Sequence, residues 1–511
     1  MKTNKIILSF FSLCTALVVI SACSEKDLEL VDPGKLSPET YFRTEIQIKS
    51  AVNAAYSNFQ TIGLYTRAYF FMYDLMGGDA AGNPQLEADK VQYWQFSFDS
   101  NHGNMGDYWE SCYRGINKAN FVIGNTDKIN EIPDSQLSQN LKKKYVAEAK
   151  FLRALYYFLM VPRWGDIPLI TEIPTSAEGF PKSSKDAVYD LIISDLQTAS
   201  TDLLDKGSEE VGRATKQAAS ALLGKVYLYL EEYDLALAEF EKVYGKYTLA
   251  ENYYDNFMDE TEHTSEYIFD IEYDENLGAG AIWGGPAGNG QNEATLRGQE
   301  YGWNDWFNTY PADDLLAEYE PGDTRYDDTF YTDGDTFEGH PEELTIRTGP
   351  MPDPVPDTEI YIPLERQAAW RKYQNYYKRE KEETNSSINF KYLRYADVLL
   401  MMAECENKRV GGDQDAAIGY INEVRQRPSV NLPALPLGQS PAAVFDAIVH
   451  ERRVELAGEQ SRFNDLMRWG MAATELASQG FQVGKHELWP IPNREIASNP
   501  AITEADQNPN Y

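Results

Sequence analysis

Residues 220–240 read SALLGKVYLYLEEYDLALAEF, and this stretch predicts two helices that fold back against each other. Leu223, Gly224 and Tyr227 recur at helical spacing in its first half, and Ala236 and Phe240 do so in its second half. The small residues Gly224 and Ala236 let the two helices approach closely. The rings of Tyr227 and Phe240 then fill the groove between them, so the stretch predicts a tightly packed antiparallel helix pair.

The order and spacing of these five residues match the tetratricopeptide repeat, in which similar helix pairs stack on one another. A looser copy follows at 392–427, where Ala403 takes the glycine position and Ala416 and Tyr420 take the two positions of the second helix. Two unrelated helical hairpins are the alternative interpretation, because the consensus is degenerate.

Further helices are predicted on both sides of this pair. One begins at Ser37-Pro38, one runs from about 144 to 160 and ends at Pro162, and one begins near Ser184. The chain is therefore predicted to be mostly α-helical, with tetratricopeptide-like helix pairs forming a scaffold.

Composition excludes two classes of partner. The 511 residues include 80 Asp and Glu against 46 Lys and Arg, which gives a formal charge of −34 and a pI near 4.5. Nucleic-acid binding and electrostatic docking on anionic lipid both rest on Lys and Arg, so neither is expected. Because 13% of the residues are aromatic, the chain can bury a large core.

The first 22 residues are predicted to be a signal peptide that is removed. Lys2 and Lys5 precede an uncharged apolar run at 6–20, which is short for a membrane span. Ile20-Ser21-Ala22-Cys23 then resembles a bacterial lipobox, in which the cysteine thiol is acylated, for example with palmitate. Cys23 is thus the expected lipid anchor, since several acyl chains hold a protein stably at a membrane. An ordinary secretory signal with a chance cysteine is the alternative.

The middle of the chain differs in character from its two ends. Eight glycines fall between Gly278 and Gly302, and Pro, Asp and Gly recur from Pro311 to Pro363. These are turn and loop compositions, and loops this long in a compact protein are usually functional. We expect a large irregular insertion at about 271–389, between helical parts at about 37–270 and 390–511.

Several motifs in the helical parts resemble a known family. They are AEAKFLRA at 147–154, RWGDIPL at 163–169, RYADVLL at 394–400, ERRVEL at 451–456 and NPNY at 508–511. In order and spacing they resemble the SusD/RagB family of outer-membrane nutrient-binding lipoproteins, and the resemblance extends from Cys23 to Tyr511.

The resemblance implies a single helical body at 23–511 whose loop-rich portion holds the ligand. It also implies a position at the cell outer membrane, where the protein would lie over a TonB-dependent SusC-like transporter and would bind glycans. The motifs themselves favour structural roles: Arg153, Arg163 and Asp166 fixing a turn, and the charged residues of 451–455 forming an internal ion-pair network.

Aromatic residues in polar, glycine-rich sequence are the candidates for ligand binding. Sugar rings present C–H faces that stack on flat aromatic rings, while nearby polar groups bind the hydroxyls. The candidates are Tyr93 and Trp94, in a loop that follows Asp79 and Asn83, together with Trp283, Tyr301, Trp303 and Trp306. Packing of each ring under its own loop is the alternative.

No catalytic residue, metal site or cofactor is predicted. None of the five histidines falls in a metal or nucleophile motif, and no phosphate-binding glycine motif opens a helix. The segment Asp333–Gly339 has the oxygen density that calcium prefers, but a solvated acidic turn is favoured. Cys112 and Cys405 would form either a disulfide or two buried thiols.

Four functions follow from these observations. The leading one is capture of an oligosaccharide and its delivery to a partner transporter. Capture of peptides or other nutrients on the same scaffold is the second. An outer-membrane glycoside hydrolase is the third, since it needs only two carboxylates about 5–10 Å apart. A purely structural subunit of the transporter is the fourth.

Overall fold

The computed structural model of the chain describes residues 41–174, 177–277, 293–336, 344–348, 359–362, 368–382 and 384–511. Cys23, Trp283 and the helix start at Ser37-Pro38 lie outside the described residues. The signal peptide, the lipid anchor and the stacking role of Trp283 therefore stay predictions.

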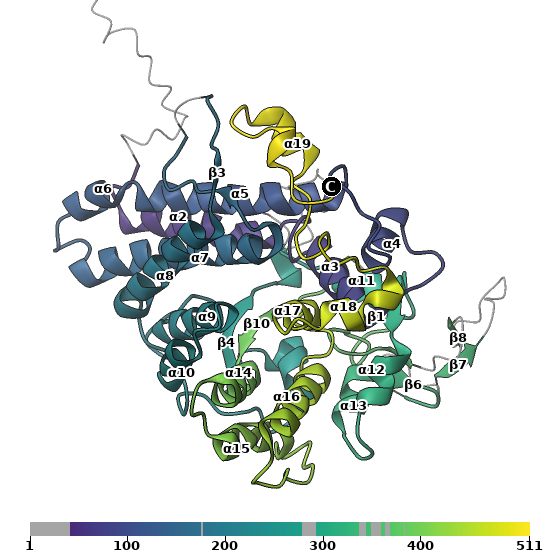
Figure 1. Cartoon of the computed structure of the whole chain (residues 1–511). Helices are drawn as coiled ribbons and strands as arrows, with labels where there is room; N and C mark the ends of the chain where they lie inside the picture. Colours follow the sequence, from purple (N-terminus) through teal and green to yellow (C-terminus); the bar gives the residue numbers. More distant parts are fainter. Residues whose placement is uncertain are drawn as a thin grey trace, which may run out of the picture.

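Four long helices build the amino-terminal half: α2 (Glu45–Ser57), α5 (Gly103–Ile123), α7 (Gln139–Trp164) and α8 (Lys185–Asp202). They pack in the order α2, α5, α7, α8, and Figure 1 shows them running side by side. The start of α8 matches the prediction, because the Ser184 hydroxyl accepts a hydrogen bond from the backbone N–H of Ala187.

The predicted end of α7 is wrong. Pro162 lies inside the helix, which continues to Trp164 and stops at Gly165, where the φ angle is +69°. A proline removes one backbone hydrogen bond but does not end the helix at once when the turn around it is buried. Glycine adopts positive φ without a steric penalty, so Gly165 is where the chain can leave the helix.

The two predicted helix pairs are present. The first is α9 (Lys216–Tyr229) with α10 (Tyr233–Glu241), and the second is α14 (Tyr395–Lys408) with α15 (Gln414–Arg425). Within the first pair, a Cβ atom on Gly224 would lie only 2.6 Å from the Phe240 ring, so the close approach depends on glycine. Helices α10 and α14 contact each other, and the pairs therefore stack as a tetratricopeptide-like scaffold.

The remaining helices are shorter. They are α3 (Ala68–Gly77), α4 (Ala88–Trp94), α6 (Thr126–Glu131), α11 (Arg297–Tyr301), α12 (Asp313–Glu318), α13 (Arg325–Thr329), α16 (Pro441–Glu455), α17 (Arg462–Arg468), α18 (Ala472–Glu475) and α19 (Asn493–Ser498). Single 3₁₀ turns occur at Asn58–Gln60, Tyr253–Phe257, Asp259–Thr261, Glu275–Leu277, Ala477–Gln479 and Glu504–Asp506. No helix among the described residues is both long enough and apolar enough to cross a bilayer.

The strands are short and form two-stranded sheets. The antiparallel pairs are β1 (Ala80–Gly82) with β5 (Thr309–Pro311), β2 (Ile167–Pro168) with β3 (Lys182–Ser183), β4 (Tyr267–Ile271) with β10 (Phe390–Arg394), and β6 (Phe330–Thr332) with β9 (Ala368–Trp370). Strands β7 (Thr345–Thr348) and β8 (Glu359–Ile362) pair in parallel. The fold is thus mostly α-helical, as predicted, and the described part of 271–389 consists of short elements joined by loops.

Buried ion pairs link the carboxyl-terminal helices to the rest of the molecule. The Glu455 carboxylate lies 2.7 Å from both Arg394 and Arg427 and 2.9 Å from Arg325, and all four side chains are at most 2% exposed. Glu266 lies 2.6 Å from Arg394 and from Arg427. The predicted internal ion-pair network around 451–455 is confirmed.

The structure also bears on two other predictions about side chains. The guanidinium of Arg153 binds Asp195 of α8 at 2.7 and 2.9 Å, because the two helices pack side by side, and it also donates to the carbonyl of Thr171 in the segment after α7 at 3.3 Å. Cys112 and Cys405 are buried free thiols, so the disulfide alternative is wrong.

Candidate functional site

Strands β1 and β5 bring together two of the segments predicted to bind ligand. The β1–β5 pairing sets Ala80 opposite Pro311, and the backbone N–H of Asn83 donates to the carbonyl of Asn308 at 2.9 Å. The Gln85 side chain donates to the carbonyl oxygen of Trp306. Residues 79–94 and 301–311 therefore lie side by side, although more than 200 positions separate them in the chain.

Trp94 is the last residue of helix α4, and not part of a loop as predicted. Its ring is partly exposed and packs against a small apolar cluster that includes Ala81, Trp303 and Tyr310. The ring also lies against Gly82, where a Cβ atom would be 3.4 Å from the indole. One side of the indole is thus supported by packing.

A cavity of about 520 Å³ opens beside Trp94. Its walls come from α3, α4, β1, α12, α16, α17 and α18, which lie in the centre and on the right of the molecule in Figure 1. Charged and polar side chains line it: Asp313, Asp314, Arg453, Arg462, Glu475, Ser478 and Gln479. Only Ala312, Asp313 and Asp314 come from the predicted insertion at 271–389, so most of the lining belongs to the flanking helices.

Arg453 lies on the cavity wall and is held by carboxylates. Its Nε donates to Asp79 at 3.0 Å, and its Nη2 donates to Asp314 at 2.9 Å. Asp79 is 4% exposed, and burial raises its pKa, against the opposing effect of Arg453 and Arg462. Asp79 thus positions an arginine and does not face a ligand, which corrects the predicted role.

Arg462 offers free donors to the cavity. Its side chain is only 9% exposed, yet Nε and Nη1 have no hydrogen-bond partner among the described residues, and Nη2 is 3.5 Å from Glu475. Burial lowers the pKa of Arg462. The Oε1 atom of Gln479 is likewise buried without a partner. Unsatisfied buried polar atoms cost free energy, so these atoms indicate a polar ligand.

Three of the predicted aromatic residues are core residues. Tyr93 and Tyr301 are fully buried, and Trp303 is 7% exposed. The Tyr301 hydroxyl donates to Asp74 at 3.0 Å, and the Trp303 ring lies 5.3 Å from that of Tyr376. A ring must present an open face to stack on a ligand, so burial argues against the predicted ligand contact by these three residues. Tyr93 lies on α4 and Tyr301 on α11, whereas Trp303 lies in the turn after α11.

Asn83 and Trp306 differ from that group. Asn83 is 5% exposed, and its Nδ2 has no hydrogen-bond partner, but it does not line the cavity. Trp306 is partly exposed beside Gln85. A ligand contact by Trp306 stays a prediction, whereas burial argues against one by Asn83.

Sequence reasoning missed Arg462, Glu475 and Gln479. Arg462 is the first residue of the segment RFNDLMRW at 462–469. The sequence of this segment does not show which of its side chains faces a cavity. Glu475 and Gln479 stand in ordinary helical sequence near α18. Their place on the cavity follows from the packing of α17 on α3 and α18, which the local sequence does not show.

The calcium prediction at Asp333–Gly339 stays open. The Asp333 carboxylate accepts from the N–H of Ile346 at 2.8 Å, and that of Asp335 accepts from the N–H of Thr332 at 2.6 Å. Both carboxylates thus have backbone partners in the turn, while Phe337–Gly339 lie outside the described residues. A separate group of potential metal ligands, His263, Asp270 and Glu272, lies around β4 and does not line the cavity beside Trp94.

Both halves of the chain match models of known protein families. Residues 230–511 match the SusD family, and residues 31–228 match a family described as "Starch-binding associating with outer membrane". A SusD-like protein of Formosa agariphila is 26% identical over 100% of this chain and 99% of its own length. A SusD-like protein of Bacteroides ovatus is 24% identical over 89% of this chain and 81% of its own length.

Solved structures agree with this assignment. A structure described as a laminarin-binding SusD-like protein superposes with a TM-score of 0.75, is 26% identical, and covers 92% of this chain and 100% of its own. Surface glycan-binding protein A from Bacteroides thetaiotaomicron, solved in complex with laminarihexaose, has a TM-score of 0.72 at 23% identity and shares the fold over 91% of this chain and 99% of its own. The family match covers more than half of the residues, and the chain belongs to the SusD family.

Proposed function

We propose that this protein captures an oligosaccharide in the cavity beside Trp94. The observation that carries the proposal is the pairing of a partly exposed indole with the unpartnered donors of Arg462 in one cavity. An indole provides a flat apolar surface for a sugar ring, and the guanidinium provides directed donors for its hydroxyls.

The mixture of charges in the cavity favours a neutral polyhydroxylated ligand over a peptide. Arg453 and Arg462 stand near Asp313, Asp314 and Glu475, so donors and acceptors alternate along the wall. Sugar hydroxyls donate and accept in turn and can bind both kinds of group. A site for peptide capture, by contrast, would be acidic and would lack an exposed ring.

The relatives support the same ligand class. One similar structure is described as laminarin-binding, and another was solved with laminarihexaose bound. The identity of the sugar in this protein depends on the shape and the lining of the cavity.

We further propose that the protein is held at the outer membrane by acyl chains on Cys23 and passes its ligand to a SusC-like TonB-dependent transporter. The lipobox-like Ile20-Ser21-Ala22-Cys23 and the description of the family matched by residues 31–228 support this. Metabolic labelling with palmitate should mark the wild-type protein and leave Cys23→Ala unlabelled. Affinity purification of the wild-type protein should recover the transporter.

The binding test first screens a panel of soluble polysaccharides for those that slow the migration of the protein in a native gel. Titration calorimetry then measures the affinity for each polysaccharide that does so. Trp94→Ala and Arg462→Gln should each weaken binding about tenfold or more, which corresponds to about 1.4 kcal/mol or more. The first variant removes the stacking surface, and the second removes charged donors.

Tyr244→Ala is the matched control, because Tyr244 is a 41% exposed ring in the turn after α10 and does not line the cavity. It should bind like the wild type. Circular dichroism should show the same helix content in all variants. Absence of binding to every polysaccharide, or equal binding by Trp94→Ala and wild type, would overturn the proposal. Release of reducing ends from a bound glycan would instead favour a hydrolase.

A further inference from the structure

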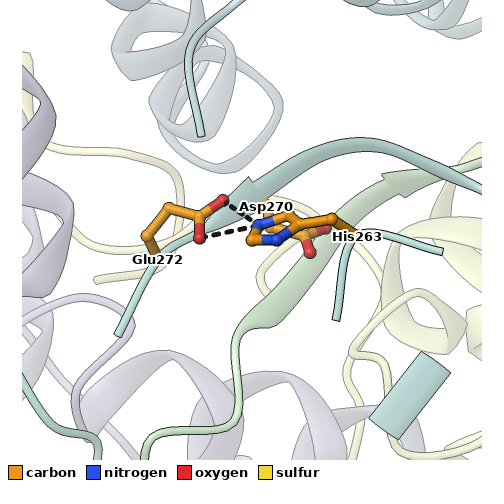
Figure 2. Close-up of side chains that lie close together, drawn as sticks. All are labelled: His263, Asp270 and Glu272. Atoms are coloured by element: carbon orange, nitrogen blue, oxygen red, sulfur yellow. Dashed lines mark hydrogen bonds and ion pairs between the residues drawn. The ribbon is translucent and has the colours of Figure 1, made fainter. Parts of the chain in front are cut away.

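The side chains of His263, Asp270 and Glu272 converge at the edge of strand β4. One potential ligand atom from each lies within 4.8 Å of the other two. The Nε2 atom of His263 is 3.1 and 3.0 Å from the two carboxylate oxygens of Glu272. Figure 2 shows the carboxylates of Glu272 and Asp270 both lying against the imidazole.

Asp270 has a buried carboxylate oxygen without a partner. Its side chain is 0% exposed, and Oδ2 accepts from the ammonium group of Lys391 at 2.6 Å, on the neighbouring strand β10. The other oxygen, Oδ1, has no hydrogen-bond donor in the part of the chain that the structure describes. A buried carboxylate oxygen left unpaired is costly, and a cation at the cluster would satisfy it.

The cluster carries more carboxylates than ammonium groups. Asp270 and Glu272 both interact electrostatically with Lys391, so two carboxylates share one ammonium group. Glu262 also faces Lys391, but burial raises the pKa of its carboxyl group to about 8. A divalent cation between Asp270 and Glu272 would meet carboxylate charge that Lys391 alone does not balance.

Two further features suit a ligand cluster. His263 adopts a φ angle of +60°, which is uncommon for a residue other than glycine, and such conformations concentrate at functional sites. Asn389, the residue before strand β10, donates to Glu272 at 2.7 Å, and Lys391 of β10 donates to Asp270 at 2.6 Å. These two side chains thus hold two carboxylates of the cluster. Hydrogen bonds of this kind orient metal ligands.

An ion could reach the cluster through a cavity, and two of the ligand side chains have room to rotate. Asp270 and Glu272 line a cavity of about 390 Å³ between α2 and β4. At Gly212 a Cβ atom would lie 3.2 Å from the Glu272 side chain, so glycine leaves room for that carboxylate. Glu272 and His263 are 35% and 28% exposed, which allows the small rotations that bring ligand atoms to about 2.0–2.2 Å from an ion.

The geometry points to a binding site for a first-row transition-metal dication, of which Zn²⁺ is the appropriate probe. One imidazole nitrogen and two carboxylates are a donor set that zinc accepts, with water in the remaining position. Calcium prefers six to eight oxygen ligands and is not expected to compete. A bound ion would join residues 261–264 to β4, and so would stabilise the segment that precedes the strand.

The experiment titrates the metal-free full chain with ZnCl₂ and, separately, with CoCl₂, whose visible absorption reports nitrogen and oxygen ligation. The wild type should bind one equivalent and melt at a higher temperature with Zn²⁺. His263→Gln and Glu272→Gln should each weaken binding by at least about 10–100-fold, because each removes a direct ligand. Both side chains are partly exposed, so both variants should keep the helix content of the wild type.

His450→Gln is the matched control. His450 also contacts two carboxylates, but Glu318 lies 2.6 Å from Nδ1 and Glu320 lies 3.2 Å from Nε2, on opposite sides of the ring. They cannot meet at one ion, so this variant should bind Zn²⁺ like the wild type. The proposal is overturned if the wild type binds no Zn²⁺, if His263→Gln binds it equally well, or if an equal concentration of Ca²⁺ displaces it.

Discussion

His486 is fully buried close to the carboxyl terminus, between aromatic rings. Its Nδ1 accepts from the backbone N–H of Gln482 at 2.8 Å, and its Nε2 has no hydrogen-bond partner. The rings of Phe96 and Phe98 lie 5.3 and 5.5 Å away. Burial, assisted by Lys485, lowers the pKa of His486 to about 4.

This histidine should make the folded state sensitive to mild acid. Its pKa in the unfolded chain is about 6.5, so between pH 6.5 and pH 4 the unfolded state binds more protons than the folded state. The stabilising contribution is therefore complete above pH 6.5 and is lost as the pH falls toward 4. Its upper limit is about 3 kcal/mol, at about 1.4 kcal/mol per pKa unit.

The measurement compares the free energy of unfolding of the wild type and His486→Gln in urea from pH 4 to pH 8. The advantage of the wild type should shrink as the pH falls. His450→Gln should show the opposite trend: burial opposes protonation of His450, but Glu318 and the other nearby carboxylates raise its pKa overall. A pH-independent difference between wild type and His486→Gln would contradict the assignment.

Single residues also show where sequence reasoning stopped. Trp94 and Trp303 both stand in polar, aromatic-containing sequence, and nothing local distinguishes them. In the structure Trp94 is partly exposed beside a cavity, whereas Trp303 is 7% exposed in a small core. Exposure depends on which distant segments pack on each ring, and that information is not local.

Helix pairs were predicted well because their determinants are local. The spacing of Leu223, Gly224 and Tyr227 places these three residues on one face of α9, and the interface with α10 follows from it. Helix ends were predicted less well. Helix α7 passes through Pro162, where its end was predicted, and α2 starts at Glu45 behind a Thr44 cap, whereas the predicted start at Ser37 lies outside the described residues.

The glycine of the first pair should be sensitive to one added methyl group. Gly224→Ala places Cβ 2.6 Å from the Phe240 ring, so α9 and α10 must separate, and we expect a loss of about 1–3 kcal/mol in the free energy of unfolding. Gly419→Ala in α15 is the control, because a Cβ there meets no atom within 4 Å. It should stabilise by about 0.5–1 kcal/mol, since alanine favours the helix.

Urea denaturation of both variants measures the two effects. Both glycines lie inside helices, so the gain in helix propensity is common to both, and the difference between them reports the packing at Phe240. Equal stabilities for the two variants would show that α10 can move aside without cost.

The whole molecule is joined by the buried network around Glu455. Arg325 comes from the insertion, Arg394 from β10 and Arg427 from the loop after α15, and all three contact Glu455 of α16. Burial alone would raise the pKa of Glu455, but Arg427, Arg394 and Arg325 hold it well below its ordinary value. The stabilisation is therefore complete above about pH 4.5 and is lost as the pH falls further.

Glu455→Gln should cost about 3–5 kcal/mol, because it leaves buried guanidinium groups without their carboxylate. Glu241→Gln, on the exposed side of α10, should change stability by less than about 0.5 kcal/mol. Urea denaturation at pH 7 measures both. A loss of less than 1 kcal/mol for Glu455→Gln would show that the arginines find other partners or water.

The order of residues was enough to predict the fold class, the helix pairs, the family and the internal ion-pair network, because periodicity and motif spacing are properties of nearby positions. The cavity could not be predicted in this way. Its walls join Gly77–Gln95, Ala312–Asp314 and Arg453–Gln479, segments that meet only after the chain has folded. Whether a ring stacks in the core or faces a ligand, and whether an arginine keeps a free donor, depends on what packs against it from far along the chain.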